Sequence, residues 1–67
     1  MGAYKKEIVC EDFDIVVDPF HNSLSEKLKV VALEILETLP DNMSRDLAIS
    51  HLLQSASFIK ASIILGE

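Results

Sequence analysis

The sequence predicts a single domain of the α+β class, residues 1–67, in which a short N-terminal β-hairpin precedes an antiparallel two-helix hairpin. Apolar residues alternate with polar ones within residues 5–18, as in half-buried strands. Over residues 23–39 and 44–65 they recur at helical spacing. The link between these segments is too short for anything but an antiparallel helical hairpin. A chain of 67 residues buries only about 60% of its unfolded surface, so we expect it to be oligomeric.

The predicted β-hairpin has strands at residues 6–10 and 13–17, joined at Glu11 and Asp12. In that register Cys10 faces Phe13 across the hairpin. The loop lacks the glycine that a type I′ turn favours, so a longer turn or a bulge stays open. One face is then apolar, as expected of a hairpin packed on a helix, and carries Ile8, Cys10, Phe13, Ile15 and Val17.

Start and stop signals bound the two predicted helices. Asn22 and Ser23 resemble a helix start, and Ser23 with Glu26 three residues later forms a capping box. The first helix spans residues 23–39 and ends before Pro40. The second spans residues 44–65 and ends at Gly66, a left-handed stop. The expected core stripes are Leu24, Leu28, Val31, Ile35 and Leu39 in the first helix, and Ala48, Leu52, Ala56, Ile59 and Ile63 in the second.

Composition excludes several classes of function. Eleven acidic against six basic residues argue against a nucleic acid polymer as partner. The uninterrupted apolar runs are far shorter than the roughly 20 residues of a membrane span, so we expect a cytoplasmic protein with no membrane partner. Cys10 is expected to be a buried, inert thiol, and His21 and His51 are too few for a structural metal site. We therefore predict no metal, no cofactor and no catalytic residues, and hence no enzyme.

The polar side of the second predicted helix carries no charge between Asp46 and Lys60. A solvated helix face is normally rich in Lys and Glu. Coverage by another subunit is the favoured explanation, and coverage by a ligand is the alternative. The interface predicted for an obligate oligomer consists of Val30, Leu33, Ser50, Gln54 and Ser57.

Arg45 is the only arginine and lies in the first turn of the second predicted helix. A cation beside free backbone N–H groups can bind an anion. A surface arginine paired with Asp41 or Asp46 fits the sequence equally well. The cations that could join Arg45 in an anion site are Lys5, Lys6, Lys27 and Lys29.

The C-terminal half carries a recognisable pattern. Leu39-Pro40-Asp41 is followed by Arg45, by the run Leu47-Ala48-Ile49-Ser50-His51-Leu52, and later by Phe58, Ala61 and Ile63. This pattern resembles the helical hairpin shared by phage nucleotide sponges that counter bacterial CBASS and Thoeris immunity. Ser50 takes the place of a threonine in that family and Phe58 that of an aromatic residue. Met43 stands where the family has an arginine, and Arg45 comes two residues later.

The resemblance implies a non-catalytic protein that sequesters a cyclic nucleotide or a cyclic ADP-ribose isomer between subunits of a dimer or hexamer. Such a sponge would block anti-phage defence in the cytoplasm of an infected bacterium. The alternative is a small oligomeric module for protein–protein interaction or regulation, with no small-molecule ligand. The ligand-binding residues expected for a sponge are Arg45 and Lys27 at phosphate, Ser50 and His51 at ribose or base edges, and Phe20, Tyr4 or Phe58 stacked on a base.

Overall fold

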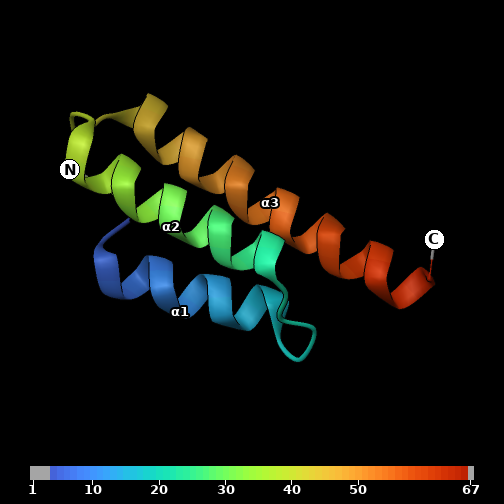
Figure 1. The fold of residues 1–67 in the computed structure, drawn as a ribbon. Coiled ribbons are helices and arrows are strands. Elements are labelled where there is room, and N and C mark those ends of the chain that lie inside the picture. The colour runs from blue at the N-terminus through green and yellow to red at the C-terminus, as the bar shows by residue number, and fades with distance from the viewer. Residues whose placement is uncertain (1–3, 67) are drawn as a thin grey trace.

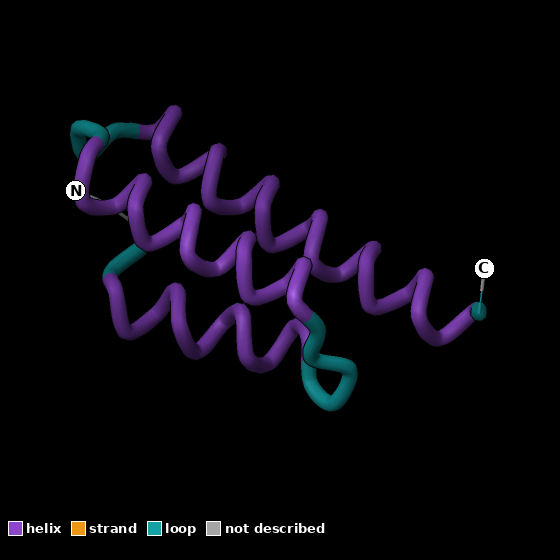
Figure 2. Tube along the Cα trace, viewed as in Figure 1, coloured by secondary structure: helices purple, strands orange, loops and turns teal. Residues whose placement is uncertain are grey.

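A computed structural model describes residues 4–66, which form three α-helices and no strand. The helices are α1 (Lys6–Val17), α2 (Ser23–Thr38) and α3 (Met43–Leu65). Consecutive helices run antiparallel, and their two connections lie at opposite ends of the bundle (Figures 1 and 2). The molecule measures 38 × 18 × 15 Å, and α3 extends past the other two helices (Figure 1). The radius of gyration of 12.0 Å exceeds the ~11 Å of a compact chain of this length.

The predicted α+β class and its hairpin at residues 5–18 are wrong, because this segment is helix α1. Val9, Phe13 and Val17 recur every four residues and are the buried side chains of α1, whereas Ile15, assigned to the apolar hairpin face, is exposed. The β-branched residues Ile8, Val9, Ile15, Val16 and Val17 imitate strands in the sequence. Packing of one helical stripe against α2 and α3 overrides that propensity.

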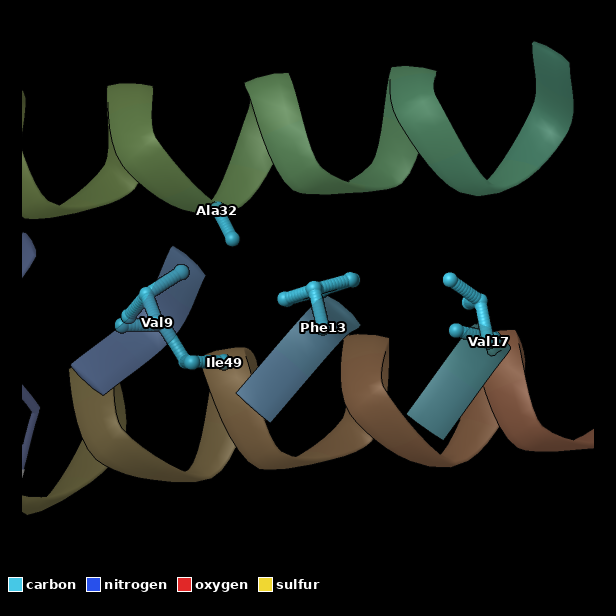
Figure 3. Close-up of a cluster of buried hydrophobic side chains, with 6 residues drawn as sticks. Val9, Phe13, Val17, Ala32 and Ile49 are labelled. Carbon is cyan, nitrogen blue, oxygen red and sulfur yellow. The ribbon is translucent and has the colours of Figure 1, made fainter. Parts of the chain in front are cut away.

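The core lies where the three helices meet. Val9, Phe13 and Val17 form a row along α1 between α2 and α3 (Figure 3). Ala32 points from α2 toward this row (Figure 3), and Ile49 and Ala56 complete the buried cluster from α3. The alanines let neighbouring helix backbones approach closely, so that a small core is filled without large voids.

Asparagines begin two of the helices. The side chain of Asn22 accepts a hydrogen bond from the backbone N–H of Ser25 at 2.9 Å, and Asn42 accepts one from the N–H of Arg45 at 2.9 Å. Asn22 therefore caps α2 in place of the predicted Ser23 capping box. Gly66 ends α3 in the left-handed conformation with φ 71°, which confirms the expected stop at that glycine.

The buried face of α2 is narrower than the stripe predicted for it. Leu24, Val31 and Leu39 are exposed, and Ala32 is the apolar residue of α2 that is buried. The reason is that α2 contacts both α1 and α3, so its buried face centres on the line between two neighbours. Helices α1 and α3 therefore cover only part of the apolar surface of α2.

Two lysines connect different parts of the bundle. Lys29 of α2 contacts Asp14 of α1 at 3.3 Å. The hydrogen bond to Asp14 raises the pKa of Lys29 above its ordinary value of 10.5, against the opposing effect of partial burial. Lys60 of α3 donates a hydrogen bond of 2.6 Å to the backbone carbonyl of Asp18, which joins the C-terminal half of α3 to the connection between α1 and α2.

Candidate functional site

The residues predicted to bind a ligand do not converge within one chain. Arg45 lies in the first turn of α3, beside one connection, and Phe20 lies in the other connection. The two connections are at opposite ends of the bundle (Figure 1). The 16 residues of α2 separate these ends by about 24 Å. Lys27 is exposed on α2, while Tyr4 packs against the core cluster. Ser50 and His51 lie in the second and third turns of α3.

Arg45 is engaged with the end of α2. Its Nη1 donates to the carbonyl oxygens of Leu36 at 3.3 Å and of Leu39 at 3.5 Å, and its Nη2 lies 3.1 Å from Asp41 Oδ1. The side chain is only 10% exposed. A cation at a helix C-terminus satisfies free carbonyls and the helix dipole. The geometry therefore corresponds to the pairing of Arg45 with Asp41 that the sequence left open, with an added capping role for α2.

The side of α3 turned away from the core is the most distinctive surface of the molecule. We call it the outer face and define it as Leu47, His51, Gln54, Phe58, Ala61 and Leu65. Ile49 and Ala56 lie on the opposite side of α3 and are fully buried. Phe58 is 76% exposed, Leu65 is 70% exposed and Leu47 is 52% exposed. Large apolar side chains of this face therefore stand in solvent near the start of the helix and again along its last two turns.

The outer face carries no charged residue, although the chain as a whole has a formal net charge of -5. It is flanked by small side chains, namely Ala48, Ser50, Ser55, Ser57 and Ser62. Exposed apolar residues that stand singly, as Leu47 does on the outer face, are normal on protein surfaces. Phe58, Ile64 and Leu65 are all exposed within the last two turns of α3, and such a grouping indicates an interaction site. The outer face is therefore our candidate interaction surface.

The sequence prediction identified this side of α3 only in part. It assigned Ser50, Gln54 and Ser57 to an interface because charge is missing there, and it assigned Phe58 only a stacking role. The missed signal is the alternating spacing of four and three residues from Leu47 to Leu65. The two α2 residues predicted for the same interface differ in their exposure. Val30 is exposed, whereas Leu33 packs against the core cluster.

The groups considered for catalysis or metal binding are dispersed. Cys10 lies on α1 and is half-buried, so it is less enclosed than the buried thiol expected from the sequence. His21 approaches Glu26 at 3.8 Å, whereas His51 is exposed on the outer face. Within residues 4–66, no three His, Cys, Asp or Glu side chains are grouped to hold a metal ion, and no pocket is found.

By length and composition, α3 is also a candidate membrane span among the described residues. One such helix is weak evidence for a membrane span, although only 11% of the apolar window of α3 is buried inside the bundle. Lys60 stands within the apolar C-terminal half of α3, where a membrane interior would make its charge costly. The cytoplasmic location and the lack of a membrane partner stay predictions.

Comparisons with protein-family models, with curated proteins and with solved structures found no match to this chain.

Proposed function

We propose that this chain is a small, non-catalytic interaction module that binds a protein partner through the outer face of α3. One observation supports this function above all. The outer face is uncharged and presents Leu47, Phe58 and Leu65 to solvent on a chain whose net charge is -5.

The chemistry of the outer face suits a protein partner. Burying an exposed Leu or Phe side chain contributes about 1.5 to 3 kcal/mol, and aromatic residues are enriched at the centre of protein interfaces. Phe58 therefore serves as the main anchor. His51 and Gln54 supply hydrogen-bonding groups that fix the orientation of the partner without placing a charge in the contact.

Site-specific photo-crosslinking tests this function. A photoreactive phenylalanine analogue replaces Phe58 in one variant and Ile15 in a second, in cells that express the chain. Ile15 is a matched control because it is an exposed apolar residue of α1. We expect a protein adduct from position 58 that position 15 does not give. Equal labelling from both positions, or adducts to lipid alone, would contradict the proposal.

Sequestration of a cyclic nucleotide or a cyclic ADP-ribose isomer is a second candidate function. It is favoured by His51 and Phe58, which lie two turns apart on the same exposed helix face and offer a hydrogen-bonding ring and a stacking ring. Cations for the phosphates would come from exposed lysines such as Lys27, in more than one chain, since Arg45 is engaged with α2. Under this function the ligand is released unchanged.

A thermal-shift panel of cyclic dinucleotides, cyclic trinucleotides and cyclic ADP-ribose isomers tests sequestration. A ligand that binds only the folded state raises the melting temperature. Heat release of the bound ligand, followed by chromatography, then distinguishes an unchanged signal from a cleaved product. No shift with any member at saturating concentration would overturn this candidate and leave the protein-binding function standing.

A further inference from the structure

The outer face of α3 has the spacing of a two-helix seam. Successive members from Leu47 to Leu65 are separated by four, three, four, three and four residues, which is the heptad pattern of paired helices. Ile49 and Ala56, the buried residues of α3, occupy the heptad position opposite this seam. Helix α3 can therefore keep its contacts with α1 and α2 while a second helix lies along its other side.

The seam is complementary to itself when two copies run antiparallel. With the two-fold axis crossing the seam at the level of residue 56 along the helix, Leu47 of one copy meets Leu65 of the other. His51 then meets Ala61, and Gln54 meets Phe58. A large side chain faces a smaller one in the second of these layers, which favours interdigitation. Antiparallel helices also bring opposite ends of their dipoles together.

The distribution of charge allows a second copy to pair through the same face. The exposed surfaces of α1 and α2 carry carboxylates such as Glu11, Glu34 and Glu37. The outer face of α3 is uncharged over its whole length, so a second outer face can cover it without burying an unpaired charge. The small flanking residues, mostly serines, let the two helix backbones approach and keep hydroxyl groups at the solvated rim.

On the premise of the function proposed above, we propose that the partner of the outer face is a second copy of this chain, bound by antiparallel pairing of two α3 helices. The seam is about 27 Å long. One helix pair of that length is smaller than the standard interface of about 800 Å² per partner. The dimer is therefore reversible and forms with increasing concentration, unlike the obligate oligomer expected from the sequence.

Disulfide trapping tests the pairing and its direction. In a Cys10→Ala background, which removes the native thiol, one chain carries Leu47→Cys and another carries Leu65→Cys. Positions 47 and 65 lie about 27 Å apart along one helix, so they cannot react within a chain. We expect a covalent heterodimer when the two variants are mixed and oxidised, and little dimer from either alone. Dimers from each single variant would indicate parallel helices and overturn the proposal.

Sedimentation equilibrium of the full chain with its native Cys10 tests the surface independently of the trapped thiols. We expect a monomer–dimer equilibrium for the unmodified protein and a dissociation constant roughly 100-fold higher for Phe58→Glu, because two unpaired charges would enter the seam. Ile15→Glu adds the same charge on α1 and should leave the equilibrium unchanged. Circular dichroism should show both variants as helical as the unmodified protein, because both positions are exposed.

These results separate the inference from the proposed function. A chain that stays monomeric at millimolar concentration would overturn pairing with a second copy, while a photo-adduct from position 58 to another protein would still support the interaction module. A photo-adduct to the chain itself supports both. Binding of the chain to phospholipid vesicles through position 58, with no protein adduct, would overturn both in favour of a membrane surface.

Discussion

The two faces of α3 are almost equally apolar, yet they have opposite environments. The inner face places Ile49 and Ala56 in the core, fully removed from solvent, while the outer face leaves Phe58 and Leu65 exposed. Neither face carries a charge between Asp46 and Lys60. The apolar character of a helix face therefore does not predict whether that face packs into the core. The number of neighbouring helices decides which faces are buried. With only three helices among residues 4–66, one side of α3 stays uncovered.

The largest expected effect concerns the inner face. Ile49→Ala should lower the free energy of unfolding by about 2 to 5 kcal/mol, because it leaves a cavity in the core. That is a large part of the ~3 to 10 kcal/mol expected for a chain of this length. The matched outer-face variant Leu47→Ala should cost less than about 1 kcal/mol in dilute solution. Urea denaturation followed by circular dichroism measures both, and equal losses would break the distinction between the faces.

The polar residues of α3 extend the comparison. Arg45 bonds to the carbonyl oxygens of Leu36 and Leu39, so Arg45→Met should destabilise the fold by about 1 to 3 kcal/mol. His51→Ala alters an exposed residue of the outer face and should change stability by less than about 0.5 kcal/mol. Thermal melts of both variants give the values. If Arg45→Met leaves the melting temperature unchanged, the contact of Arg45 with α2 is not formed in solution.

A smaller effect than that of Arg45→Met is expected away from α3, in the contact between Lys29 and Asp14. The pKa of Lys29 is raised in the folded state by its hydrogen bond to Asp14. The stabilisation is therefore complete below pH 10.5, the ordinary pKa of lysine, and is lost as the pH rises through the higher folded-state value.

Asp14→Asn should remove this dependence and cost about 0.2 to 1 kcal/mol at neutral pH, since the pair is largely solvated. Melting temperatures of both proteins between pH 7 and about pH 11 provide the measurement. A stability difference between them that stays constant up to the highest pH would contradict the assignment.

The sequence predicted the helical hairpin well because its signals are local. Residues 44–65 have helical periodicity and a glycine stop, and the structure places α3 at Met43–Leu65 with Gly66 in the left-handed conformation. Helix α2, predicted at residues 23–39, spans Ser23–Thr38. The side chain of Asn42 caps α3, one residue before the helix begins at Met43.

The errors arise where tertiary packing decides between two local patterns. The apolar residues of α1 fit both a strand alternation and a four-residue repeat, and only contact with α2 and α3 selects the repeat. The role of Arg45 was equally undetermined, because its bonds go to carbonyl oxygens of α2 that no sequence pattern identifies. The spacing of Leu47, Phe58 and Leu65 in the sequence could have shown that these residues share one face of α3. It could not have shown that this face is exposed.

The backbone amide chemical shifts of the ¹⁵N-labelled, unmodified protein test the difference between the two faces of α3 most directly. We predict that dilution from millimolar to micromolar concentration changes the shifts of Leu47, Gln54, Phe58 and Leu65 most. The shifts of Ile49 and Ala56 and those of α1 should change least. Shifts that do not depend on concentration would contradict pairing of two outer faces. Changes centred on exposed apolar residues elsewhere, such as Ile15, would contradict the assignment of the outer face as the binding surface.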